Sequence, residues 1–287
     1  MRYSECLPRP SLAAFVRCVW RFESEDVDLA PQGVVPDGCS ELIVHLKAPY
    51  AESAGDGPWI VQASTLFAGQ LTRPLHLKPT GPVSVAAVRF QPAGARRFVG
   101  APLNKFTDLR TSLVELHGKR ATADLIHHTG SAQDDDALWV ALQDYVEAHL
   151  AQPPRDEALV MLVVDRLARS GGRSSMAELA IRTGLTSRTL ERRFLDVVGV
   201  SPRSLASVFR LRGFFAALEA SPGADLTELA LAAQWFDHSQ MSRDFRRFLG
   251  CTPSAFLRSG PGLAASLATG TADALSETYK QVRRPRG

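Results

Sequence analysis

Two stretches of the chain repeat one pattern of apolar, basic, glycine and proline residues. Residues 186–202 read TSRTLERRFLDVVGVSP, and residues 238–253 read HSQMSRDFRRFLGCTP. When their final prolines are aligned, Gly199 falls on Gly250, and an arginine and a phenylalanine of one copy fall on the same residue types in the other. A repeat of this kind indicates two copies of one structural unit. Each copy has a polar cap, a basic amphipathic helix and a glycine stop.

The apolar spacing predicts that each repeated helix is the second helix of a helix-turn-helix unit. The apolar residues of each copy recur at the helical period, so they share one face and should be buried. A shorter helix precedes each copy, and a long apolar helix joins the two units. The expected helices are 176–183 and 188–198, with Ser187 as N-cap, then 203–220, 226–233 and 239–249. The expected inward residues are Leu190, Phe194, Leu195 and Val198, followed by Met241, Phe245 and Phe248.

The outward faces of the two repeated helices carry residue types that read DNA. A helix of this kind enters the major groove with its N-terminal residues against base edges. Arginine binds guanine with two hydrogen bonds, and glutamate accepts one from cytosine. The residues expected to contact bases are Arg188, Thr189, Glu191 and Arg192 in the first helix and His238, Ser239, Gln240 and Arg243 in the second. The residues expected to contact phosphates are Ser187, Arg193, Arg246 and Arg247.

The distribution of charge supports an anionic partner for the same region. The chain has a net charge of only +3, but residues 171–260 hold 12 arginines, no lysine and 8 acidic residues. Residues 1–170 hold more acidic than basic residues. Arginine without lysine suits bidentate recognition of phosphate and guanine, although a GC-rich gene would also favour arginine. A solvated helix face explains one such helix as well as DNA binding does, but it explains two aligned copies poorly.

Residues 1–130 have the pattern of a β-rich domain. Short apolar runs alternate with Pro- and Gly-containing turns, as in a small barrel or sandwich that can hold a small ligand. A helix is expected at residues 95–99, and residues 103–109 and 113–116 are ambiguous. The candidate strands are 16–22, 41–46, 59–62, 75–77 and 83–90.

No residue cluster in this front region has the pattern of a catalytic or metal site. The histidines include no H-x-H pair, and the four cysteines form no C-x-x-C pair, so we expect no metal or cofactor. His45 is expected to be a packed or surface residue, and Asp37 a turn residue because glycine follows it. Arg89 lies inside an apolar strand, and it should pair with a local carboxylate or, less favourably, with an anionic ligand.

The remaining segments predict a helical linker and a flexible tail. Residues 131–170 contain two helices, at 137–150 and 156–168, that could form a dimer surface or cap the front domain. Residues 259–287 are rich in small and polar residues and end in a basic run, which is typical of a flexible tail. The N-terminus lacks the apolar segment of a signal peptide, and the chain lacks a run long enough to span a membrane. The expected location is the cytoplasm.

Residues 171–258 resemble the DNA-binding domain of AraC/XylS-family transcription regulators. The family's base-reading positions correspond to Arg188, Glu191, Arg192, His238, Ser239, Gln240 and Arg243. One departure is the second turn, where the family has glycine before an aromatic residue and this chain has Gln234-Trp235. The resemblance rests on Leu179-Ala180, Gly184-Leu185, Ser187-Arg188-Thr189-Leu190, Arg192-Arg193-Phe194, Gly199, Pro202, Leu229-Ala230, residues 242–246, Gly250, Thr252-Pro253 and Phe256.

The front domain also resembles AraC-like regulatory domains that carry a P-D-G-C-x-E/D-L-I signature, here residues 36–43. That resemblance implies a sensing role without naming an effector. The sequence thus predicts an α+β chain: a front barrel-like or sandwich-like regulatory domain (1–130), a helical linker (131–170), an all-α double helix-turn-helix domain (171–258) and a tail (259–287). The predicted function is transcriptional regulation through promoter DNA, with a small-molecule effector, a homodimer and RNA polymerase as further expected partners. The alternative is that the front domain is an enzyme or a protein-recruiting module.

Overall fold

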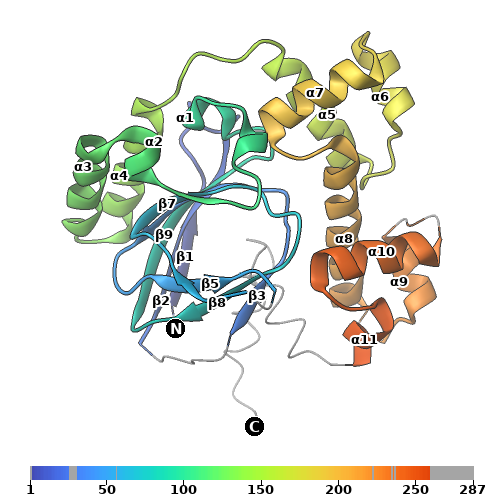
Figure 1. Cartoon of the computed structure of the whole chain (residues 1–287), viewed down its shortest axis with the longest axis horizontal. Helices are drawn as coiled ribbons and strands as arrows, with labels where there is room; N and C mark the ends of the chain where they lie inside the picture. Colours follow the sequence, from blue (N-terminus) through green and yellow to red (C-terminus); the bar gives the residue numbers. More distant parts are fainter. Residues whose placement is uncertain are drawn as a thin grey trace.

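The computed structural model describes residues 2–25, 31–55, 57–221, 223–233, 235 and 237–258. A β-rich part, here called the front part, is followed along the chain by helices, here called the rear part, that lie beside it on the right of Figure 1. The expected α+β class is therefore confirmed. The tail at 259–287 and the departure at Gln234 lie outside the described residues.

The strands of the front part form two antiparallel sheets. The six-stranded sheet has the order β1-β2-β9-β4-β7-β10, and the four-stranded sheet has the order β3-β8-β5-β6. The sheets do not close into a barrel, so the arrangement is sandwich-like. The strands are β1 (Arg2–Cys6), β2 (Val16–Ser24), β3 (Gln32–Val34), β4 (Glu41–His45), β5 (Tyr50–Ser53), β6 (Ile60–Val61), β7 (Thr65–Ala68), β8 (Leu75–Pro79), β9 (Val83–Phe90) and β10 (Arg110–Ser112).

The helices divide between the two parts of the chain. The front helices are α1 (Arg96–Val99), a 3-10 turn (Leu103–Lys105), α2 (Leu113–His117), α3 (Lys119–Gly130) and α4 (Asp135–Ala148). The rear helices are α5 (Glu157–Arg169), α6 (Met176–Thr183), α7 (Ser187–Val198), α8 (Pro202–Ala220), α9 (Leu226–Ala232), α10 (His238–Leu249) and α11 (Pro253–Arg258).

One face of the six-stranded sheet packs on α3 and α4. Alternate residues of β4, Leu42 and Val44, join Leu138 and Leu142 of α4 in one buried core, as the period of two along a strand requires. The opposite face of this sheet lies toward the second sheet. An ion pair between Arg110 of β10 and Glu52 of β5 connects the two sheets there. All eight residues of β9 are buried, which fits a central strand covered on both faces.

The rear part has two separate cores, one for each helix-turn-helix unit, and α8 contributes to both. Leu205 and Phe209 of α8 lie in the core of the first unit, together with α5 and α7. Val208 and Phe214 lie in the core of the second unit, together with α9, α10 and α11. A helix that is apolar on two sides must be buried on both, so α8 joins the units through packed side chains.

The predicted linker segment is shared between the two parts. Helix α4 packs into the front core, whereas Val160, Val163 and Leu167 of α5 pack into the core of the first helix-turn-helix unit. The N-cap of α4 is Asp134, whose side chain accepts from the Ala137 amide. Within this chain, the two linker helices therefore serve different cores.

Several elements differ from the sequence predictions. The segments 16–22, 41–46, 59–62 and 75–77 overlap β2, β4, β6 and β8, and 83–90 coincides with β9. Strands β1, β3, β5, β7 and β10 were not predicted, because they are short and owe their strand conformation to pairing with distant segments. Residues 119–130 form a helix in a region predicted to be β-rich. That helix buries Thr122, Leu125 and Thr129, which have helical spacing. The pattern was missed because two of these three buried residues are threonines and not apolar residues.

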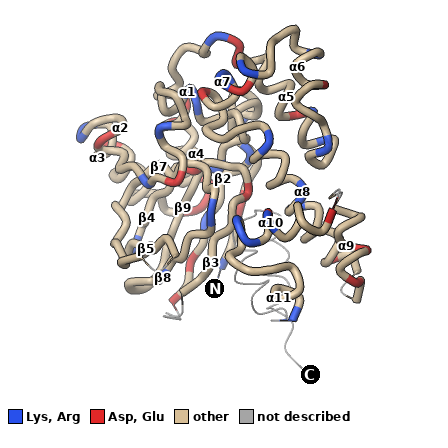
Figure 2. Tube along the Cα trace, turned by 45° about the vertical axis from the view of Figure 1, so that its right-hand side comes forward, with Lys and Arg blue, Asp and Glu red and all other residues tan. Residues whose placement is uncertain are grey.

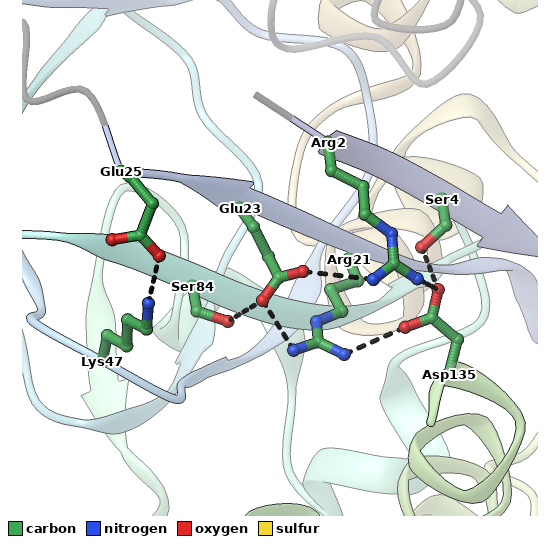
Figure 3. Close-up of polar contacts among 8 residues, drawn as sticks. All are labelled: Arg2, Ser4, Arg21, Glu23, Glu25, Lys47, Ser84 and Asp135. Atoms are coloured by element: carbon green, nitrogen blue, oxygen red, sulfur yellow. Dashed lines mark hydrogen bonds and ion pairs between the residues drawn. The ribbon is translucent and has the colours of Figure 1, made fainter. Parts of the chain in front are cut away.

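A charged cluster ties the start of α4 to the first two strands (Figure 3). Asp135 accepts hydrogen bonds from Arg21 Nη1 at 2.9 Å and from Ser4 Oγ at 2.7 Å, and Arg2 also contacts it. Glu23 accepts from Arg21 at 2.7 Å and from Ser84 Oγ at 3.2 Å. Burial raises the pKa of Asp135, but Ser4, Arg21 and Arg2 outweigh burial and hold that pKa below its ordinary value.

The substitution Asp135→Asn should destabilise the chain in a pH-dependent way. We expect a loss of about 1–2 kcal/mol at pH 7, because the hydrogen bonds from two arginines lose their charge assistance while Arg2 is largely solvated. A carboxylate whose pKa is lowered by folding stabilises the fold above its unfolded pKa of about 3.9, and this contribution is lost as the pH falls through the folded pKa. Urea unfolding of both proteins should therefore show a difference at pH 7 that shrinks below about pH 4. An equal difference at both pH values would contradict this role.

Candidate nucleic-acid interface

Helices α7 and α10 are the two repeated helices that the sequence predicts to read DNA, and they are called the reading helices below. The first of them, α7, is held by a cap and an apolar stripe. Helix α6 ends at Gly184, and α7 begins one residue after Thr186, whose side chain accepts from the Thr189 amide. The N-cap is therefore Thr186, whereas the sequence analysis expected Ser187. Ser187 is the first helical residue. Thr186 is better placed because its extended backbone aims its hydroxyl at the open amides of the first turn.

The expected inward and outward faces of α7 are largely confirmed. Leu190, Phe194 and Val198 are fully buried, Leu195 is half-buried, and Val197, which was not predicted, is also fully buried. On the other face, Arg188, Glu191 and Arg192 are exposed, and Thr189 is half-buried beside the cap. The helix thus presents its expected base-contacting side chains to solvent.

The second reading helix, α10, repeats this construction. Asp237 is its N-cap and accepts from the Gln240 amide at 2.6 Å, and Gly250 ends it. Met241, Phe245 and Phe248 are fully buried, as expected. The expected base-contacting residues His238, Ser239 and Arg243 are exposed, and Gln240 is half-buried.

The turn before α10 is one residue longer than the turn before α7. The buried Leu229-Ala230 pair of α9 corresponds to Leu179-Ala180 of α6, whereas the N-cap of α10 lies one residue further along than that of α7. Trp235 anchors this longer turn: it is buried, and its Nε1 donates to Asp244 Oδ2 at 2.9 Å.

Arginines lie along both reading helices (Figure 2). Their side chains differ in what they contact. Arg246 is exposed. Arg193 forms an ion pair with Asp156 at 3.0 Å. Arg247 donates from Nε to the Thr72 carbonyl at 3.3 Å and from Nη2 to Ser204 Oγ at 2.9 Å. Two of the expected phosphate contacts therefore already have partners within the protein.

Both reading helices also contact the front part, and they do so at equivalent positions. Asp196 of α7 pairs with Arg96 at 3.3 Å, and the residue at the same place in the second copy is Arg247, which contacts Thr72. Thr107 donates to the Gly199 carbonyl at 2.6 Å, at the end of α7. These contacts were not predicted, because nothing in the repeat itself reveals a partner so far away in the sequence.

The loop at residues 35–39 joins the front part to α8. Val35 lies in the core of the second helix-turn-helix unit. A Cβ atom on Gly38 would lie 2.8 Å from Leu205 Cδ1, so the loop backbone packs directly against α8. The predicted turn role of Asp37 is confirmed, since it accepts from the Cys39 amide at 2.9 Å.

Behind this loop lies a buried charged cluster. Arg89 pairs with Glu41 at 2.9 Å and with Asp37 at 3.5 Å, which confirms the predicted local carboxylate partner. Trp20 Nε1 also donates to Glu41 at 2.9 Å. Burial raises the pKa of Asp37, and the charge of Arg89 opposes that shift.

A second polar chain links the two sheets. His45 is buried, which confirms its expected packed role, and its Nε2 lies 3.0 Å from Gln62 Oε1. Gln62 donates to Glu52 at 2.6 Å, and Glu52 pairs with Arg110. Burial lowers the pKa of His45.

Neither a metal site nor a membrane helix is visible in the described residues. No group of three or more His, Cys, Asp or Glu side chains there is arranged to hold a metal ion. Within the same residues, every helix is too short or too polar to cross a bilayer.

Two protein families match parts of the chain. Residues 4–112 match a domain of unknown function, DUF6597, which includes the 36–43 segment. Residues 179–259 match the helix-turn-helix domain family HTH_18, which covers both reading helices. This part of the chain is a helix-turn-helix domain. The family match supports DNA binding and transcription regulation.

Solved structures similar to this chain include two of ToxT from Vibrio cholerae. One, with unsaturated fatty acid bound, is 12% identical, covers 83% of this chain and 93% of its own, and has a TM-score of 0.45. Another is 10% identical, covers 90% of this chain and 98% of its own, and has a TM-score of 0.43. The AraC-like transcriptional activator CuxR is 13% identical, covers 81% and 91%, and has a TM-score of 0.27. Such TM-scores are too low to define a fold, which is defined by the elements described above. A search of curated proteins found no match.

Proposed function

We propose that this AraC-type chain regulates transcription by reading two neighbouring major-groove segments with α7 and α10. The observation that carries the proposal is the repeated construction of the two helices: each is capped, each buries one apolar stripe, and each exposes polar residues at its N-terminal end. One subunit with two such helices can occupy two groove segments about one helical turn, or ~34 Å, apart.

Each expected site residue has a role in this proposal. Arg188, Arg192 and Arg243 contact guanines, and Glu191 accepts from a cytosine amino group. Thr189, His238, Ser239 and Gln240 complete the base-reading surface. Ser187 and Arg246 contact phosphates, as do Arg193 and Arg247 once they exchange Asp156 and Thr72 for the DNA backbone.

The front domain would control DNA binding in response to a small-molecule effector. The contacts that support this proposal are those of Arg96 and Thr72 with the two reading helices, together with the packing of Gly38 against α8. We regard residues 36–43 as a regulatory-domain signature because they join the Arg89 cluster to α8. An effector that binds the folded chain would raise its melting temperature in a ligand screen.

The proposed domains are residues 1–130, 131–170, 171–258 and 259–287. The proposed partners are a second copy of the chain, in a homodimer, and RNA polymerase. The proposed location is the cytoplasm.

Selection of bound duplexes from a random DNA pool by the full-length chain tests the proposed function. We expect an enriched motif with two boxes centred about 10 base pairs apart, one for each reading helix. A motif with one box would show that only one helix reads bases and would contradict the double-reader mechanism. A pool without enrichment would overturn sequence-specific DNA binding altogether.

A further inference from the structure

A single buried arginine of α8 contacts both helix-turn-helix units. The Arg210 side chain is only 5% exposed. Its Nη1 donates to the Gly172 carbonyl at 2.7 Å, where the chain leads into α6 of the first unit. Its Nη2 donates to Ser207 Oγ at 2.8 Å and lies 3.7 Å from Asp244 Oδ2, on the reading helix of the second unit.

Asp244 connects this arginine to the turn before α10. The same oxygen, Oδ2, accepts from Trp235 Nε1 at 2.9 Å. The Asp244 carboxylate of α10 therefore contacts both Trp235 in the turn before α10 and Arg210 of α8. Phenylalanine at position 235 would fill similar space but could not donate this hydrogen bond.

The contact at Gly172 allows little movement. Gly172 has a φ of +81°, and a Cβ atom there would lie 2.2 Å from the Ala206 carbonyl oxygen of α8. The backbone that enters the first unit is thus in direct contact with α8 at the place where Arg210 binds it. Since α8 is one continuous helix, this contact and the Asp244 contact have a fixed separation.

The equivalent position in the first unit has a parallel arrangement with the charges reversed. In the aligned repeat, Asp244 of α10 falls on Arg193 of α7. Arg193 pairs with Asp156, the N-cap residue of α5. Each reading helix therefore has an ion pair with a neighbouring helix at the same repeat position, but only the more deeply buried Arg210–Asp244 pair is kept when Arg193 turns to the DNA backbone. Burying such a pair is costly and often adds no net stability, so its role can be to select one geometry.

We propose that Arg210, Asp244 and Trp235 set the angle and separation between α7 and α10, and so determine which spacing of the two DNA boxes is bound. The inference rests on the proposed function, in which both helices read bases. Arg210 acts here as a positioning residue, because it touches no DNA and acts through the helices that do. One inserted base pair moves the second box by about 3.4 Å and rotates it by about 34° around the duplex axis. A rigid pair of reading helices cannot follow that change.

The test measures the affinity of the full-length chain for duplexes in which the box spacing is varied by one and two base pairs. For the wild type we expect about tenfold weaker binding at the altered spacings, comparable to the effect of one mismatched base pair. For Arg210→Met we expect this penalty to fall to about twofold, while affinity for a duplex with only the first box stays unchanged. Trp235→Phe removes only the indole donor, and it should reduce the penalty to a smaller extent.

Thermal unfolding of each variant and a matched control keep the outcomes distinct. Arg203→Met removes an exposed arginine from the same helix, and it should retain the tenfold spacing penalty of the wild type. If Arg210→Met does not fold, the spacing penalty of Trp235→Phe alone tests the role of the cluster. A wild-type penalty retained in the folded variants would overturn the role of the cluster and leave the proposed function intact. A wild type without any preferred DNA would instead overturn the proposed function, and this inference with it.

Discussion

Replacing Arg192 by alanine is expected to weaken binding to the selected DNA by about 1–3 kcal/mol, because a bidentate contact to guanine is lost. Arg192 is exposed on the face of α7 opposite Leu190 and Phe194, so the fold should tolerate the change. Fluorescence anisotropy on the selected duplex and on random duplexes measures the effect. Binding to random DNA should change little, because it depends on phosphate contacts.

The control for this experiment is Arg169→Ala, which removes a side chain that is 77% exposed on α5 and belongs to neither reading helix. This variant should bind the selected duplex as tightly as the wild type. The identity of the base opposite Arg192 adds a further check, since the alanine variant should discriminate less at that position only. Equal losses on selected and random DNA would leave Arg192 a phosphate contact and contradict its base-reading role.

Replacing Phe245 by alanine is expected to lower the free energy of unfolding by about 3–5 kcal/mol. The ring is fully buried in the second helix-turn-helix unit, 4.9 Å from the ring of Phe214, 5.8 Å from that of Trp235 and 6.0 Å from that of Phe256. Truncation would leave a cavity among rings that cannot collapse into it without moving α10. Chemical denaturation measures the loss, which would be a large part of the stability of a domain.

The effect of this substitution should be greatest in the second unit. Phe245 belongs to a core that is separate from the one formed by α5, α6 and α7. Amide hydrogen exchange should therefore accelerate in α9, α10 and α11 more than in α7. Leu231→Ala is the control, since Leu231 is 78% exposed on α9 and its loss should change stability by less than about 0.5 kcal/mol. A loss below about 1 kcal/mol for Phe245→Ala would show that the core tolerates the cavity.

Local sequence signals predicted the rear helices from α5 to α10 well, whereas the short helix α11 was not predicted. The expected segment 176–183 coincides with α6, and the expected 203–220 differs from α8 by one residue. Glycine stops, polar caps and helical spacing act within one or two turns, so they are legible without the fold. The one misplaced cap, Ser187 for Thr186, lay between two adjacent residues with similar hydroxyl side chains.

The front part was less legible because its strands depend on distant partners. Strand β10 is three residues long and pairs with β7, which lies more than forty residues earlier in the chain. Such pairing depends on the whole sheet and leaves no local signal in the sequence. The edge strands β1 and β3 likewise carry little alternation of their own. Only β9, buried along its whole length, has an apolar run strong enough to be predicted to its last residue.

The amino-acid sequence predicted α7 and α10 and most of the residues that each helix buries or exposes, because the helical period assigns side chains to faces before any packing occurs. Tertiary structure alone decided what holds those helices in place. Arg193 meets Asp156, Asp244 meets Arg210, and Arg247 meets the Thr72 carbonyl only after separate segments have packed together. An ion pair needs its charges within a few ångströms, and no local pattern in the repeat could reveal which distant residue would come that close.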